Sequence, residues 1–138
     1  MRIDTVTVHA TDTPASMKVT PDHLYQWHVV ENGWNPPHGY HGFIDRTGRY
    51  WEGRDWDTLG AHVGGQNTGN LGLALEGGRA GEPFTDAQLD TLRGLLDHIM
   101  RRYKAPKLKN HRDLDPGKTC PGPEFDVKEW YYYAPRID

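Results

Sequence analysis

Apolar and polar residues alternate at the start of the chain, in Thr5-Val6-Thr7-Val8-His9. A period of two places both valines on one face and the two threonines and His9 on the other, which predicts a strand with one buried face. His9 stands at the end of this strand, away from its main apolar face. Taken alone, that position favours a half-exposed surface histidine over a ligand.

The next patterns predict a helix and a hairpin. Thr20 and Pro21 are suited to the cap and the first position of a helix that runs to about Asn32-Gly33. Its two histidines, His23 and His28, are expected to serve solvent or packing, because neither has a ligand-type partner one turn away. Residues 40–45 and 49–53 then predict two short strands around a glycine-containing turn.

Residues 71–76 predict a third strand region, with three leucines on one face and Gly72, Ala74 and Glu76 on the other. Two very small side chains on one face leave room for something other than a packed helix, such as a substrate. The glycine-rich stretch before this strand, residues 60–70, has no Lys-Ser/Thr after its glycines. It is therefore expected to shape a pocket wall and not to bind phosphate.

The second half of the chain predicts a long amphipathic helix, followed by a short strand and a final helix. Thr85 and Gln88 form a capping box, and the apolar residues behind it share one stripe: Leu89, Leu92, Leu96, Ile99 and Tyr103. Leu108 lies in the short strand, and Asp126 caps the final helix. Together these elements predict one α/β domain over residues 1–138, with a central mixed β-sheet flanked by helices.

Composition limits the partners. At 138 residues the chain is long enough for one domain with a core, and its single cysteine excludes an internal disulfide. A net charge of −3 gives no electrostatic reason for nucleic acid as the main ligand. The start lacks the apolar run of a signal peptide, and no stretch reaches membrane-spanning length. We therefore expect a cytoplasmic product without membrane insertion.

Candidate chemistry concentrates in residues 110–122, which contain His111, Lys118 and Cys120. Proline and glycine within this stretch predict a loop of fixed shape, because they disrupt helices and strands. One imidazole and one thiolate are half of a plausible zinc site, and His9 at a strand end is a candidate for the rest. Two histidines and a cysteine leave one tetrahedral position open, as in catalytic zinc sites. A fourth protein ligand from one of the remaining histidines is the alternative, which would make the site structural.

The chain resembles the zinc-dependent N-acetylmuramoyl-L-alanine amidases over nearly its whole length. Single-domain phage endolysins are its nearest counterparts in that family, and peptidoglycan recognition proteins are more distant. The resemblance lies in the order and rough spacing of short segments: Val8-His9-Ala10, Gln26-Trp27-His28, Gly39-Tyr40-His41, Gly53-Arg54-Asp55, Gly60-Ala61-His62 and Lys118-Thr119-Cys120-Pro121. Each tripeptide is weak alone, whereas their joint order is specific.

The resemblance implies a peptidoglycan-cleaving zinc hydrolase, with the site in a surface cleft at the strand ends. It implies one Zn²⁺ per chain and a monomeric protein that serves host-cell lysis by a phage. The residues that it implies are zinc ligands (His9, His111, Cys120), catalytic groups (Tyr40, Lys118) and substrate-binding positions (His41, His62).

The chain also departs from the family pattern. Gly42 stands where phage members carry a bulky apolar residue, so we expect loose packing beside Tyr40. Another branch of the family uses a catalytic glutamate at the position of Ala74. Alanine cannot do that work, so a site of the Tyr40 type is favoured. Glu76, two residues on, is expected to tune that site.

Two alternative functions remain open. The first is a non-catalytic peptidoglycan-recognition module, against which Cys120 argues, because recognition-type relatives typically lack the cysteine ligand. The second is a zinc-stabilised interaction protein with residues 130–133 as its interface. We expect these aromatic residues to pack a final helix on the core instead.

Overall fold

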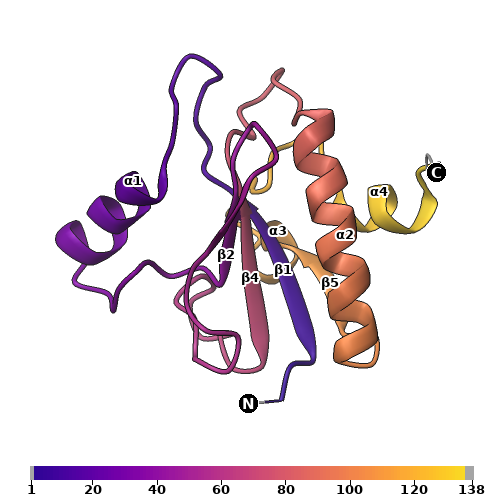
Figure 1. Cartoon of the computed structure of the whole chain (residues 1–138), viewed down its shortest axis with the longest axis horizontal. Coiled ribbons are helices and arrows are strands. Elements are labelled where there is room, and N and C mark those ends of the chain that lie inside the picture. Colours follow the sequence, from indigo (N-terminus) through magenta and orange to yellow (C-terminus); the bar gives the residue numbers. More distant parts are fainter. Residues whose placement is uncertain (1, 136–138) are drawn as a thin grey trace.

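A five-stranded mixed sheet forms the centre of the molecule (Figure 1). The computed structural model describes residues 2–135, so the ends of the expected domain, Met1 and residues 136–138, lie outside it. The strand order is β3-β2-β4-β1-β5, and β3 alone runs antiparallel to its neighbour. The strands are β1 (Thr5–Ala10), β2 (Gly42–Ile44), β3 (Tyr50–Glu52), β4 (Asn70–Leu75) and β5 (Lys107–Asn110). This architecture confirms the α/β prediction.

Helices cover both faces of the sheet, and Figure 1 shows α1 and α2 on opposite sides of it. α1 (Pro21–Tyr25) continues directly into a π-helical segment, η1 (Gln26–Glu31), so the expected single helix is present with a wider second half. α2 spans Asp86–Arg102 and α4 spans Val127–Tyr133. Residues 110–122 were expected to form only a loop, but they begin with one helical turn, α3 (His111–Leu114).

The main core lies between α2 and the sheet. The helix begins at the expected cap, where the Gln88 backbone N–H donates to the Thr85 hydroxyl. Three of its predicted apolar positions are fully buried against valines of β1 and leucines of β4: Leu92, Leu96 and Ile99. Gln88 is buried as well, and its amide is satisfied there because it donates to the carbonyl groups of Ile44 and Glu76. That amide ties the first turn of α2 to β2 and to the residue that follows β4.

The opposite face of the sheet has no free space at its small residues. Ala74 is fully buried in a second apolar cluster with Val19, Leu24 and Phe43, which joins α1 to the sheet. A Cβ atom added at Gly72 would lie 2.5 Å from Cγ of His62, so the His62 ring occupies that position. The expectation that these small residues leave room for a substrate is therefore wrong.

Gly42 likewise faces a filled space. A Cβ atom there would lie 2.5 Å from the Tyr50 ring, which packs across the hairpin from β3. The expected loose packing beside Tyr40 is therefore wrong, because a neighbouring aromatic ring occupies the space that a bulky residue would take.

Strand direction brings the candidate residues together. β1 and β5 are parallel neighbours, with Val8 in register with Asn110, so both strands end at the same edge. His9 lies near the end of β1, and His111 follows β5 directly. Ligand sites form at such carboxyl edges in α/β sheets. Within residues 2–135, every helix is too short or too polar to cross a membrane.

Candidate active site

A cavity of about 330 Å³ opens at the carboxyl ends of β1 and β5. Six of the seven site residues expected from the sequence line it: His9, Tyr40, His62, His111, Lys118 and Cys120. His62 and Ala61 contribute to its wall, so the glycine-rich loop shapes a pocket as predicted. These residues come from five separate parts of the chain, which only the fold places around one space.

Three potential metal-binding side chains meet at this cavity. One nitrogen of His9, one nitrogen of His111 and the sulfur of Cys120 all lie within 4.8 Å of one another. Among the residues that the structure describes, this is the one such group of histidine, cysteine or acidic side chains. His9 is only 1% exposed, so the alternative of a surface histidine is wrong.

Burial keeps both histidines of this group uncharged. It lowers the pKa of His9 well below its usual value, and the nearby His62, His111 and His28 lower it further. The pKa of His111 is lowered chiefly by burial, against an opposing effect of Asp115. A neutral imidazole has a free nitrogen lone pair, which is the form that binds a metal ion.

A hydrogen bond holds the side chain of Cys120 at the end of β1. Its sulfur accepts a hydrogen bond of 2.9 Å from the backbone N–H of Ala10. Burial raises the pKa of the thiol to about 11, although this N–H group favours the thiolate. The side chain is therefore a protonated thiol at neutral pH in the protein alone, and metal binding would release its proton.

Arg112 organises the loop that carries Lys118 and Cys120. Its guanidinium donates to the carbonyl oxygen atoms of Gly122 and Phe125, at 2.8 and 2.6 Å. Its backbone N–H donates to the carbonyl of Cys120 at 3.1 Å. Sequence reasoning missed this residue, although an arginine beside a candidate ligand in a loop rich in proline and glycine was a usable signal.

Tyr40 and Lys118 face the cavity in different ways. The Tyr40 ring lies 5.1 Å from that of His9, between centroids. Burial raises the pKa of its phenol, and the nearby Cys120 adds to this, so the hydroxyl keeps its proton at neutral pH. Lys118 is exposed at the rim, where its flexible chain can reach into the cavity.

The two expected substrate-binding histidines differ. His41 is fully buried and does not line the cavity, and both its nitrogens contact the backbone, at Gly72 N and Thr58 O. A substrate-binding role for His41 stays a prediction without a supporting contact. His62 lines the cavity, with Nδ1 2.9 Å from Nε2 of His9 and Nε2 2.8 Å from the carbonyl of Asn70. Burial lowers the pKa of His62 to about 4.

His28 is a cavity residue whose position the sequence did not reveal. It was expected to serve solvent or packing, but it lines the same cavity together with Trp34. Its Nδ1 accepts a hydrogen bond of 2.8 Å from Gly39 N–H, and its ring lies 5.1 Å from that of Tyr40. The π-helical turn of η1 places it there.

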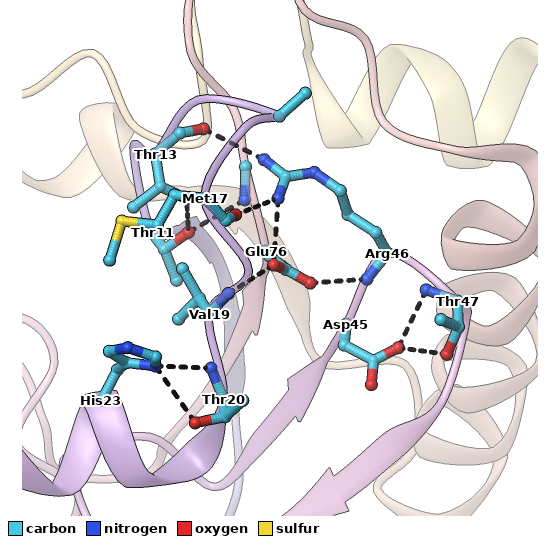
Figure 2. A network of polar contacts seen from close by, with 12 residues as sticks. Thr11, Thr13, Met17, Val19, Thr20, His23, Asp45, Arg46, Thr47 and Glu76 are labelled. Carbon is cyan, nitrogen blue, oxygen red and sulfur yellow. Dashed lines mark hydrogen bonds and ion pairs between the residues drawn. The ribbon is translucent and has the colours of Figure 1, made fainter.

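Glu76 lies behind the site and not in it. Figure 2 shows its carboxylate between Arg46 and the backbone of Val19. Arg46 also donates to the carbonyl groups of Met17 and Thr13, at 2.7 and 3.2 Å. This buried network fixes the segment before α1, and so supports the wall that carries His28. Glu76 was expected to tune the site, but it makes these contacts instead and does not line the cavity.

Comparison with known proteins identifies relatives over most of the chain. The profile of the family described as N-acetylmuramoyl-L-alanine amidase matches residues 1–123. An endolysin of Klebsiella phage KP32 is 41% identical over 129 residues, which are 90% of this chain and 82% of the relative. Peptidoglycan-recognition protein SC2 of Drosophila melanogaster is 28% identical over 86% of this chain and 66% of the relative.

A solved structure has the same fold. The N-acetylmuramoyl-L-alanine amidase LysC from Clostridium intestinale matches with a TM-score of 0.82 and 29% sequence identity. The match covers 93% of this chain and 82% of that one.

Proposed function

The chain belongs to the N-acetylmuramoyl-L-alanine amidase family, and we propose that it uses one zinc ion to hydrolyse the amide between N-acetylmuramic acid and L-alanine of peptidoglycan. The observation that carries this proposal is the meeting of His9, His111 and Cys120 in the cavity that Tyr40 and Lys118 also line. Similarity to a phage endolysin supports lysis of a bacterial host as the setting. We propose that the enzyme works as a monomer.

The chemistry of the donor set fits zinc. Two neutral imidazoles and one sulfur are typical zinc ligands, and three protein ligands leave a position open for catalysis. When bound, zinc supplies Lewis-acid chemistry for hydrolysis. His9, His111 and Cys120 would hold it.

The remaining groups act on the substrate. Lys118 is a cation on a flexible chain at the cavity rim, so it can donate to the oxygen that becomes negative when the amide carbonyl is attacked. Tyr40 keeps its proton because its pKa is raised, so its hydroxyl is a donor at neutral pH. We assign it the orientation of the attacking water or the delivery of a proton to the leaving amine.

Mass spectrometry of purified peptidoglycan tests the proposal directly. Zinc-loaded protein is expected to release stem peptides that begin at L-alanine, and a chelated sample is expected to release none. Activity should return when zinc, but not magnesium, is added back, because the sulfur ligand disfavours a hard ion. Intact peptidoglycan in every sample would contradict the proposal and would favour the non-catalytic recognition module.

A further inference from the structure

The protons on the His62 ring can be assigned from its two hydrogen bonds. Nε2 of His62 lies 2.8 Å from the carbonyl oxygen of Asn70, which can only accept, so this nitrogen carries a hydrogen. A neutral imidazole has one N–H group, and therefore Nδ1 of His62 is an acceptor. The atom that faces it, at 2.9 Å, is Nε2 of His9.

The tautomer of His9 follows from this contact. Because Nδ1 of His62 accepts, Nε2 of His9 must carry the hydrogen and donate it. The free lone pair of the His9 ring then lies on Nδ1, the one nitrogen left for a metal ion. The contact also fixes the rotation of the ring, since the N–H group must point at His62.

The position of His62 is itself determined by the fold. A Cβ atom at Gly72 would lie 2.5 Å from its ring and one at Gly60 would lie 2.7 Å from it, so the two glycines leave a space of the size of an imidazole. The acceptor residue Asn70 is buried, and its amide is held by the Thr7 hydroxyl and by the carbonyl of Gln66. The ring is therefore enclosed by the sheet and by its own loop.

We propose that His62 is a positioning residue that orients the metal ligand His9 by accepting its Nε2–H hydrogen bond. The substrate contact expected from the sequence stays a prediction, and both nitrogens of His62 already have partners within the protein. The inference rests on the proposed zinc function of His9. Hydrogen-bond partners of metal-binding histidines typically contribute about 10- to 100-fold to metal affinity.

Two amide substitutions test the roles of the two His62 ring nitrogens separately. In His62→Asn the amide oxygen lies near the former Nδ1 and can still accept from His9. In His62→Gln the amide lies near the former Nε2, so the contact with Asn70 is kept and the one with His9 is lost. His28→Ala is the control, because it removes a cavity residue that contacts Tyr40 and whose Nδ1 accepts from Gly39 N–H and not from a proposed ligand.

The zinc dissociation constant, measured by competition with a chromogenic chelator, is the main readout. We expect about 10- to 100-fold weaker binding for His62→Gln and near wild-type binding for His62→Asn and His28→Ala. Equal zinc affinity in all three variants, with a raised KM for His62→Gln, would overturn the proposal in favour of substrate binding.

A second measurement needs neither zinc nor a variant. In ¹⁵N-labelled, metal-free wild type, two-bond ¹H–¹⁵N correlations report which ring nitrogen carries hydrogen. We expect the Nε2–H tautomer for both His9 and His62, and an Nδ1–H tautomer at His9 would overturn the proposal. This result is independent of whether the protein proves to bind zinc, so failure of the zinc function and failure of the His62 role are distinguishable.

Discussion

The face of the sheet that carries α2 is filled with aliphatic side chains, whereas the other face carries a group of buried histidines. On the α2 face, residues such as Val8, Leu73 and Leu96 are fully buried, and their aliphatic side chains have no hydrogen-bonding group. On the histidine side, His9, His41 and His62 are buried as well, and each has at least one ring nitrogen in a hydrogen bond.

The two kinds of packing serve different ends. Aliphatic contacts depend on volume and not on direction, so they stabilise the sheet without fixing any single atom. A hydrogen bond such as that between His9 and His62 is directional and orients a ring, as the outer partners of metal-binding histidines do. We therefore expect substitutions on the α2 face to change stability, and substitutions on the histidine side to change metal affinity and chemistry.

Loss of a proposed ligand should have the largest effect. In His9→Ala and Cys120→Ala, zinc and activity are expected to disappear together, since the proposed metal would supply several kcal/mol of transition-state stabilisation, or at least about 10³ in rate. Metal analysis and peptide release measure both quantities on the same sample. Full activity in either variant would remove that residue from the site.

A core substitution should show the opposite pattern. Leu96→Ala removes a fully buried side chain between α2 and the sheet, and is expected to lower the free energy of unfolding by about 2–5 kcal/mol. Urea titration of metal-free protein measures the loss. The folded fraction should bind zinc and turn over substrate as wild type does, and reduced zinc affinity would mean that the two faces are coupled.

Removing the rim cation should affect chemistry alone. Lys118→Ala is expected to lower kcat by about 10²–10³ while zinc content stays unchanged, because the lysine stabilises a developing oxyanion and binds no metal. Steady-state kinetics with parallel metal analysis tests this. A metal-free variant would instead assign Lys118 a structural role in the loop.

The smallest expected effect is a pH dependence that belongs to the histidine side. His38 is buried beside Tyr40, whose backbone N–H donates to its Nδ1 at 3.1 Å. Burial, together with His28, Arg54 and His41, lowers the pKa of His38 from 6.5 to about 4. Between these values the unfolded chain binds the proton and the folded protein does not. The contribution of neutral His38 to the free energy of unfolding is therefore fully present above pH 6.5. It is lost as the pH drops toward 4, by at most about 3 kcal/mol.

Urea titrations of chelated protein at pH 7.5 and 5 measure this slope. His38→Gln should reduce it, and only in part, because burial lowers the pKa of His62 to about 4 as well. Leu96→Ala should leave the slope unchanged, as it alters no titrating group. A wild-type stability that does not change over this range would show that these histidines titrate normally.

The sequence by itself determined the elements and the identity of the chemical groups. The cap at Thr85, the apolar stripe behind it and the alternation in β1 are local patterns, and the structure reproduces them. The resemblance to a family selected His9, His111 and Cys120, and the structure brings them within 4.8 Å of one another. Nearest neighbours along the chain suffice for the cap and strand predictions, because helix caps and strand periodicity act over a few residues.

Tertiary structure alone decided how these groups are used. The burial of His9, its contact with His62 across 53 positions, and the loss of the space at Gly72 all depend on distant segments. The same holds for the loop around Arg112 and for the placement of His28 in the cavity. The hydrogen-bond partner of each nitrogen of His62 depends on where the distant Asn70 carbonyl and the His9 ring lie, and only the packed sheet fixes those positions.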